Sequence, residues 1–374
     1  MNTVTVITVV GFLMFFTIGT AFIITSDTNE GNDLDVNIIA RANINGSGIF
    51  SNVELSIDPQ TQAEKDKWGG LVFMTPGPAS IQHFMLNRFV KEELGKNFVM
   101  YTPGGDNSKD TVYWTQVAPN LMMQTYLKEN HINGGFPWDP FFTDIRLTVG
   151  GIYCISSDLI EHNHPCCMVA AKESFLTSNE GAVLRFLSAY TESLDWVNAA
   201  LAEPLSANYA TLLEITRDFT GITNNAVLTA AFNSLTYMYD LNDPTSPYTL
   251  EEYTADLIVS FESLGVITKH VDDPVAFGNS FINHKCIDKI IADGRTETYP
   301  SKMIKVRIGH LVGDIHQIGL VVGMKLGIFE KYGVELITIQ CANGPEVMRL
   351  FQLGVIDIGI LGLPPAVSNT ANFR

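Results

Sequence analysis

The chain has 374 residues, 46% of them hydrophobic and 17% charged, which is typical of a globular protein of roughly two domains and argues against broad disorder. Its formal net charge is −17 at pH 7, and it contains no run rich in Lys or Arg. We therefore expect no nucleic-acid partner, because phosphate binding needs clustered basic side chains. An acidic surface of this kind suits a protein that stays soluble outside the cell.

An apolar stretch without any charge runs from residue 4 to residue 25. This is about the length that a helix needs to cross a bilayer. We expect residues 1–25 to be an export signal or an uncleaved membrane anchor rather than a buried core helix. The lack of Lys and Arg ahead of the apolar stretch weakens the signal-peptide interpretation and leaves the anchor open. Residues 26–34 are expected to form a tether, and the rest of the chain is expected to be extracytoplasmic, in the periplasm or at the cell surface.

Strands and helices are expected to alternate over the first 160 residues. Strands are predicted at 36–42, 49–57 and 71–75, with further strand material within 145–155. Turn-forming residues at 76–80 open a predicted helix at 81–94, and another helix falls within 112–127. Residues 58–67 are polar and make a plausible crossing between lobes.

The pattern becomes mostly helical after a short apolar strand predicted at 164–171. The spacing of apolar residues predicts helices at 182–201, 209–219, 224–239, 250–264 and 277–291. Residues 292–303 are polar, contain one proline, and are interpreted as a linker.

The last seventy residues alternate between strand and helix patterns. Strands are predicted at 304–308, 334–341 and 355–361, separated by a loop at 309–317 and a helix at 318–332 that Gly333 closes. A second helix is predicted to start at Gly344, with Asn343 as its cap and Pro345 in its first turn. The turn at 362–365 leads into a further helix. This alternation predicts βαβ units and a parallel sheet.

Three stretches carry a resemblance to a known family. They are KLGIFEKYGVE at 325–335, followed by GPEVM and GVIDIG, then TPGPASIQHFMLNRFV at 75–90 and HPCCMVAAKESFL at 164–176. Together they resemble the extracytoplasmic substrate-binding proteins of ABC importers, of the nitrate/sulfonate/taurine and thiamine-pyrimidine-precursor type. The resemblance implies an α/β, type II periplasmic-binding-protein fold with two Rossmann-like lobes and a hinge. It also implies a monomer that delivers a small solute to an ABC permease and its ATPase.

The order of these stretches differs from the family pattern. In that family the segment similar to GIFEK comes near the start of the mature protein, whereas here it comes last. We therefore favour a circular permutation over a truncated tandem array or a spliced reading frame. Lobe I is then expected to comprise residues 35–58, 160–291 and 304–374, lobe II residues 67–158, and the linker at 292–303 to join the family's termini. The strand at 36–42 should share a sheet with those at 304–308 and 355–361.

Five loops are expected to hold a ligand, because open parallel sheets bind ligands beyond the carboxyl ends of their strands and at helix N-termini. Their candidate residues are His310, Asp314, His316, Gln317, Gly362, Leu363, Asn43, Gly46, Ser47, Thr75, Gly77, Ser80, Trp138 and Asp139.

Several of these residues have a plainer interpretation beside the functional one. Ser80 either helps an anion site at 75–80 or only caps a helix, and Trp138 either stacks on a ligand or packs in a turn. Asp314 and His316 contact a polar ligand, form a surface turn, or, with His162 and His164, bind a metal. We favour the ligand contact and expect no metal and no cofactor. His164 is expected to have a hinge role.

The ligand remains open at this stage. No Lys or Arg lies in the five loops, so a neutral or amine-bearing heterocycle such as a pyrimidine, or a zwitterion such as an aminosulfonate like taurine, fits about as well as nitrate, bicarbonate or a sulfonate. The cysteines are interpreted as buried small residues rather than a redox site. The rival functions are a membrane-tethered sensory or orphan binding domain and a pyrimidine-precursor synthase that uses His310 or His316. We favour the binding protein over the enzyme, because no nucleophile elbow or phosphate loop is present.

Overall fold

The computed structural model of the chain describes residues 34–105 and 107–374. The expected signal or anchor at residues 1–25 and most of the expected tether lie outside the described residues. In the described part, no helix combines the length and the apolar character that crossing a membrane requires.

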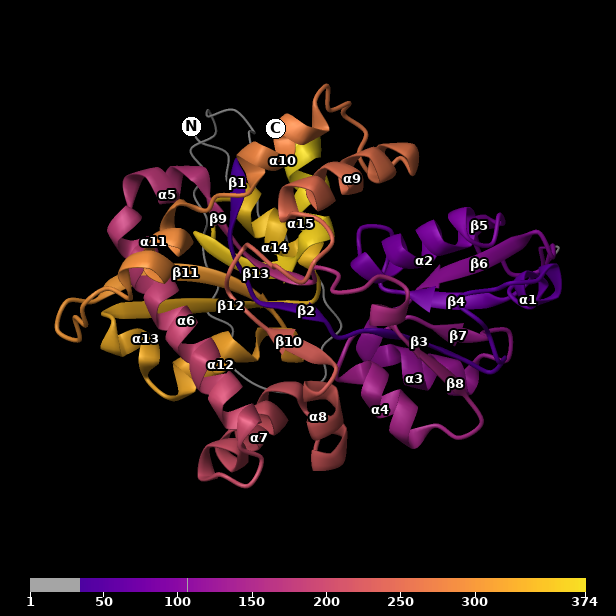
Figure 1. Ribbon diagram of the computed structural model, residues 1–374, viewed down its shortest axis with the longest axis horizontal. Coiled ribbons are helices and arrows are strands. Elements are labelled where there is room, and N and C mark those ends of the chain that lie inside the picture. The colour runs from indigo at the N-terminus through magenta and orange to yellow at the C-terminus, as the bar shows by residue number, and fades with distance from the viewer. Residues whose placement is uncertain (1–33, 106) are drawn as a thin grey trace, which may run out of the picture. The chain divides into compact units, whose positions relative to one another are not determined.

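A five-stranded mixed sheet forms the centre of the part that we call lobe I. Its order is β1 (Val36–Arg41), β9 (Cys167–Lys172), β13 (Ile358–Gly362), β11 (Ile304–Leu311) and β12 (Val334–Cys341). β11 pairs in parallel with β12 and β13, whereas β9 is antiparallel to β1 and β13. β1 therefore shares a sheet with β11 and β13, as predicted (Figure 1).

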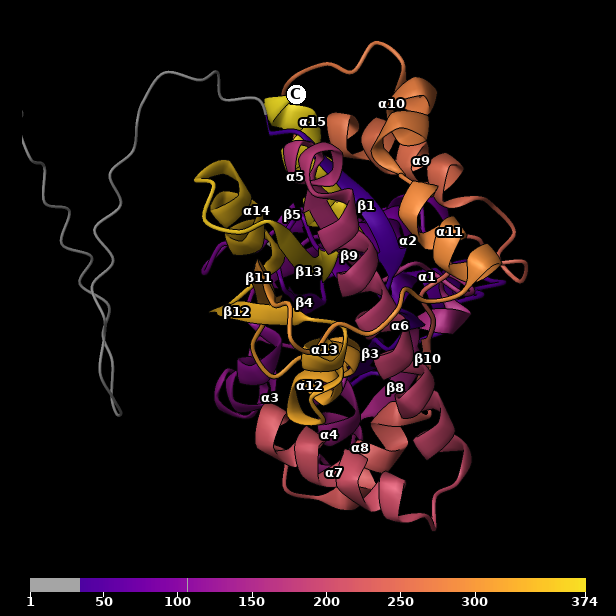
Figure 2. The ribbon, with the colours of Figure 1, turned by 90° about the vertical axis from the view of Figure 1, so that its left-hand side faces the viewer.

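Helices connect the parallel strands of this sheet on both faces. α12 (Ile318–Lys325) and α13 (Ile328–Lys331) follow β11, α14 (Gly344–Gln352) follows β12, and α15 (Leu363–Phe373) follows β13. Figure 2 shows α14 and α15 above the strands and α12 and α13 below them. Since β12 and β13 lie on opposite sides of β11, the carboxyl end of β11 is a topological switch point.

The remaining helices of lobe I surround this sheet. α6 (Glu180–Ala202) packs against α12 and α13. The others are α5 (Glu173–Ser178), α7 (Ala207–Thr220), α8 (Asn225–Phe232), α9 (Leu250–Ser263), α10 (Pro274–Phe281) and α11 (Lys285–Asp293).

A six-stranded sheet forms the centre of lobe II. Its order is β5 (Asn97–Met100), β6 (Thr111–Gln116), β4 (Val72–Thr75), β7 (Gly134–Gly135), β3 (Gly48–Ser51) and β8 (Tyr153–Ser156). β5, β6, β4 and β7 are parallel, and β3 is antiparallel to β7 and β8. Its helices are α1 (Gln62–Asp66), α2 (Ile81–Glu92), α3 (Pro119–Lys128) and α4 (Phe141–Thr148).

Two short segments connect the lobes. The first leaves β2 (Asn43–Asn45), which pairs with β10 (Leu235–Tyr237) in lobe I, and enters β3. The second returns from β8 to β9 through residues 157–166, which begin with the 3-10 turn η1 (Ser157–Leu159). Each segment contains an asparagine with positive φ, Asn45 at 62° and Asn163 at 54°, and Asn45 Nδ2 donates to Asn163 Oδ1 at 3.4 Å.

The first crossing comes earlier than the sequence predicts. Residues 48–51, which were expected in lobe I as part of 35–58, form β3 in the sheet of lobe II. Residues 58–67, expected to cross between lobes, hold α1, and Lys65 Nζ of this helix donates to the Glu93 carbonyl at 2.5 Å. The reason is that Ile49 and Phe50 are fully buried between β7 and β8, so this apolar strand completes the second sheet.

The strand predicted at 49–57 ends at Ser51, and several other predicted elements also differ in type or extent. In the stretch 145–155, where strand was expected, α4 continues to Thr148 and only the last residues belong to β8. The helix predicted at 224–239 ends at Phe232, and β10 follows it and pairs with β2. The helices predicted at 277–291 and 318–332 are each divided in two. The first break lets Asn283 N bond to Ile38 O at 2.8 Å, and the second falls at Gly327, which has a φ of 69°.

The last residues of the chain lie beside the first described strand. Leu34 N donates to Phe373 O at 3.4 Å, and Arg374 Nη2 lies 2.7 Å from Asp35 Oδ1. Residues 304–374 and the strand that begins at Val36 are thus neighbouring parts of one sheet and its helices.

Candidate functional site

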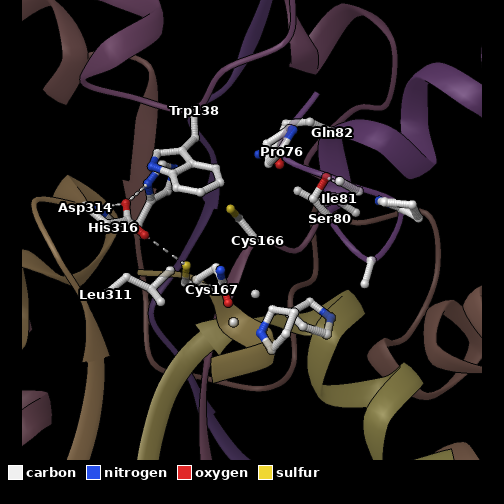
Figure 3. Close-up of a pocket in the computed structure, with 18 of the residues that line it drawn as sticks. Pro76, Ser80, Ile81, Gln82, Trp138, Cys166, Cys167, Leu311, Asp314 and His316 are labelled. Atoms are coloured by element: carbon white, nitrogen blue, oxygen red, sulfur yellow. Dashed lines mark hydrogen bonds and ion pairs between the residues drawn. The ribbon is translucent and has the colours of Figure 1, made fainter. Parts of the chain in front are cut away.

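A cavity opens between the two lobes at the carboxyl end of β11. Its empty volume is about 740 Å³, part of it open to solvent. Lobe II contributes residues 76–82, Gln116 and Trp138, and lobe I contributes Cys166, Cys167, Leu311, Asp314, His316, residues 343–345, Gly362 and Pro365 (Figure 3). The cavity therefore lies at the switch point, where open α/β sheets bind their ligands.

Three helices begin at the wall of this cavity. Ser80, Asn343 and Gly362 are the N-cap residues of α2, α14 and α15. Ser80 Oγ accepts from His83 N at 3.2 Å and donates to Gly77 O at 2.7 Å, so this hydroxyl already caps its helix. Helix N-termini favour an anionic or hydrogen-bond-accepting group. Among the residues described, no Lys or Arg lines the cavity.

A buried ion pair closes the inner end of the cavity. His316 is 1% exposed and Asp314 2% exposed, and His316 Nδ1 lies 2.5 Å from Asp314 Oδ1. Burial opposes the charged form of the imidazole, but the Asp314 carboxylate and the Cys166 thiol outweigh it and raise the pKa of His316 well above its usual value. The direction of this shift favours the protonated, positively charged form of the imidazole.

Two hydrogen-bond donors at this inner end have no partner. Trp138 Nε1 and His316 Nε2 are buried and make no hydrogen bond with any described residue. Figure 3 shows the indole of Trp138 beside the His316 side chain. An unpaired buried donor costs about 1–3 kcal/mol, so a ligand that places an acceptor oxygen here removes that penalty.

Two free thiols also face this end. Cys166 and Cys167 are 4% and 3% exposed and form no disulfide. Cys167 Sγ lies 3.7 Å from Asp314 Oδ2. The prediction that these cysteines are buried is confirmed, but both also line the cavity.

Comparison with protein families identifies the chain at the family level. A model of the NMT1-like family matches residues 7–211, which is more than half of the 374 residues. The chain belongs to the NMT1-like family. The family resemblance inferred from the sequence is thereby confirmed, and the mixed α/β architecture of this NMT1-like protein agrees with the predicted fold class.

Solved structures similar to this NMT1-like protein include three binding proteins. The ligand-binding component of an ABC-type import system from Staphylococcus aureus with zinc bound is 12% identical (TM-score 0.43; 68% of this chain and 74% of that chain). The periplasmic nitrate-binding protein of Synechocystis PCC 6803 is 14% identical (TM-score 0.46; 70% and 70%). The periplasmic aliphatic sulphonate binding protein of Escherichia coli is 13% identical (TM-score 0.43; 67% and 70%). No curated protein matches the chain.

The structure of the NMT1-like protein brings six of the expected site residues to the cavity wall: Gly77, Ser80, Trp138, Asp314, His316 and Gly362. The other eight do not line it: Asn43, Gly46, Ser47, Thr75, Asp139, His310, Gln317 and Leu363.

Four of these eight have structural partners that explain their positions. The Thr75 hydroxyl lies 3.0 Å from His83 Nδ1, Ser47 Oγ accepts from Gln82 Nε2 at 2.8 Å, and Gln317 Oε1 accepts from the backbone N of Leu311, the last residue of β11, at 2.8 Å. Asp139 is fully buried and accepts hydrogen bonds from the backbone N of Thr143 and from the hydroxyl of Ser234. Burial raises the pKa of Asp139 although these hydrogen bonds oppose it. These residues support the cavity wall.

The remaining four lie just behind the wall. Asn43 Oδ1 accepts from Cys167 N at 3.3 Å, and Gly46 packs against Leu235 and His316. His310 lies on β11, 6.0 Å from the Phe219 ring between centroids, and Leu363 is fully buried at the start of α15.

The sequence did not single out several lining residues. Gln82, Gln116 and Pro365 line the cavity, but none of them was named as a candidate site residue. Asn343 and Pro345 had a usable signal, since a cap and a proline predict a helix N-terminus that follows a parallel strand.

The metal interpretation finds no support in the geometry. His164 is buried with Nε2 2.9 Å from Ser157 Oγ, and burial together with the charge of His316 lowers the pKa of His164 to about 4. His162 instead pairs with Asp158 at 3.1 Å on the surface. Within residues 34–105 and 107–374, no group of three or more His, Cys, Asp or Glu is placed to hold a metal ion.

Proposed function

We propose that this NMT1-like protein is the extracytoplasmic solute-binding component of an ABC importer. It binds a small solute between its lobes and passes it to a permease with ATPase subunits, without a catalytic step. The observation that supports this proposal is the cavity at the switch point, walled by both lobes and carrying two unpaired donors at its inner end. In this proposal residues 1–25 export or anchor the chain, which acts as a monomer.

The donors and the lining favour a particular class of solute. The Trp138 N–H and the charged His316 favour an acceptor oxygen, while the proline side chains at the cleft favour a compact apolar body. The wall contains no Lys or Arg, and the charge of His316 is already paired with Asp314, so a bare inorganic anion lacks a free counter-charge of the kind that it usually needs. We therefore favour a small zwitterion or neutral heterocycle with one carbonyl, carboxylate or sulfonate group.

A thermal-shift panel tests this function directly. The purified protein is melted with nitrate, bicarbonate, taurine, alkanesulfonates, aminopyrimidines and aromatic acids. A true ligand at about a hundredfold excess over Kd adds about 2.7 kcal/mol to the free energy of unfolding. Taurine or an aminopyrimidine should give the larger shift. If no compound raises the melting temperature, an orphan or sensory role replaces the importer role.

Trp138 variants should separate its two contributions to affinity. Trp138→Phe keeps an aromatic face but removes the N–H, and we expect Kd to rise about threefold to tenfold because one hydrogen bond contributes about 0.5–1.5 kcal/mol. Trp138→Ala should raise Kd about 30-fold or more, since apolar contact is also lost. Isothermal titration with the panel hit measures both. Equal affinities in all three proteins would show that the indole does not contact the solute.

We also propose that the chain order is a circular permutation of the family order, with the lobe segments that this implies. Its support is the contact between the last residues and the first described strand, where Phe373 O accepts from Leu34 N and Arg374 pairs with Asp35.

A rearranged gene tests the permutation. It encodes residues 303–374, a short Gly/Ser linker and then residues 34–292. We expect this protein to fold, because the new ends fall in an exposed linker. Its melting temperature should lie within about 5 °C of that of a reference protein that contains the same residues in their present order. The control places the new ends inside α6, between residues 190 and 191, and should not fold. Failure of the first rearrangement to fold would contradict the proposal.

A further inference from the structure

The solute-binding proposal uses His316 but gives no role to the neighbouring thiol of Cys166. Cys166 lies directly before β9, and its carbonyl accepts from Leu363 N at 3.0 Å, which fixes the backbone at the cavity wall. Figure 3 shows the sulfur directed into the cavity, below Trp138. His316 and Asp314 line the same cavity, and His316 Nδ1 lies 2.5 Å from Asp314 Oδ1. A thiol, an imidazole with an unpaired Nε2 and an orienting carboxylate are thus gathered in one cavity, and these are the groups found around activated nucleophiles.

Cys166 differs electrostatically from every other cysteine in the chain. A hydrogen bond from Cys167 lowers the pKa of Cys166, burial opposes this effect, and the charged His316 adds to it. The hydrogen bond to Cys166 and burial raise the pKa of Cys167. Burial also raises the pKa of Cys154, Cys286 and Cys341. The thiolate is the reactive form of cysteine, and Cys166 combines a lowered pKa with a place on the cavity wall.

We propose that Cys166 is a nucleophilic thiol at the inner end of the cleft, which forms covalent adducts with small uncharged conjugated carbonyl compounds. The thiolate sulfur attacks the β carbon, a carbon–sulfur bond forms, and the carbon–carbon double bond breaks as its electron pair moves toward the carbonyl oxygen. The proton on His316 Nε2 then passes to the resulting enolate. No further reactant is needed, because the thiolate and the imidazolium supply the nucleophile and the proton.

N-ethylmaleimide tests this proposal on the intact protein. The protein is treated at about pH 6.5 with limiting reagent, quenched, digested, and the adduct on each cysteine is measured by mass spectrometry. Cys154 is the matched reference, because it is more exposed than Cys166. We expect Cys166 to react at least tenfold faster than Cys154. Labelling of Cys154 first, with Cys166 labelled only after unfolding in guanidinium, would overturn the proposal.

Variants of the neighbouring groups distinguish an activated thiol from a merely accessible one. His316→Gln should slow labelling of Cys166 at least tenfold and leave Cys154 unchanged, and Asp314→Asn should slow it by a smaller factor. A rate at Cys166 that is unchanged in both variants would refute activation by His316. Melting curves confirm that each variant is folded.

The pH profile is a second readout. The Cys166 rate should reach half its maximum well below the pH of about 8.5 expected for an ordinary thiol, and a midpoint at or above that pH overturns the proposal. The titratable groups packed around Cys166 and its His316–Asp314 pair are Cys167 on β9, His316 and Asp314 before α12, His164 before β9, Asp139 before α4 and Tyr237 on β10. The labelling needs no solute, so its failure leaves the solute-binding proposal standing.

Discussion

Replacing Gly46 by alanine should lower the free energy of unfolding by about 3 kcal/mol or more. Gly46 has a φ of 89°, and a Cβ built there would lie 2.3 Å from Leu235 Cδ2 and 2.4 Å from His316 Nε2. A left-handed alanine costs about 1–2 kcal/mol, and forcing an extra methyl group into packed atoms adds about 1–3 kcal/mol. Equilibrium unfolding in urea measures the loss.

Gly221→Ala is the matched control for this prediction. Gly221 has a φ of 75°, but nothing lies within 4 Å of the position of its Cβ, so we expect a loss of only about 1 kcal/mol. Similar losses in the two variants would mean that the crowding at Gly46 is relieved by small movements of Leu235 and His316.

Replacing His83 by phenylalanine should flatten the acid dependence of stability. His83 is 4% exposed, its ring packs on Trp114 with centroids 4.6 Å apart, and burial together with the charge of Lys91 lowers its pKa to about 3. The unfolded chain takes up this proton near pH 6.5, so the unfolded state binds more protons below that pH. The free energy of unfolding therefore falls as the pH drops from about 6.5 toward 3.

The size of the effect follows from the two pKa values. Between pH 7 and about pH 4.5, His83 alone should remove about 2–3 kcal/mol, and this loss should be absent in His83→Phe. Urea unfolding at both pH values gives the difference between wild type and variant, in which the contributions of other groups cancel. The control is His162→Phe, whose wild-type ring is 67% exposed and therefore hydrated in both states. An equally steep acid dependence in wild type and His83→Phe would contradict the prediction.

The sequence predicted an element best where residues at its own two ends mark where it begins and stops. The strand β12 matches its predicted bounds because its alternation ends at Gly333 and Asn343, and the Asn343 cap forms as expected. By contrast, β10 was predicted as the end of a helix. Its strand conformation comes from pairing with β2, nearly two hundred residues earlier, and no pattern within its own few residues reports that partner.

The same distinction holds at the site. Ser80 and Gly362 could be predicted because each is the N-cap of a helix that follows the carboxyl end of a strand, where open α/β sheets bind ligands. Thr75, which was also expected at the site, does not line the cavity, and its hydroxyl lies 3.0 Å from His83 Nδ1. Gln82 and Cys166 line the cavity but were not expected at the site. Each reaches the cavity only when two sheets from distant parts of the chain are packed together.

The two connections between the lobes are joined to each other through a pair of asparagines. Asn45 and Asn163 both occupy left-handed backbone conformations and are joined by a hydrogen bond, so the two connections are in contact where the chain changes lobe. Elsewhere Phe84 of α2 meets Tyr253 and Phe261 of α9 edge to face. An opening that moves α2 away from α9 separates these rings, so their packing stabilises the present arrangement of the two lobes.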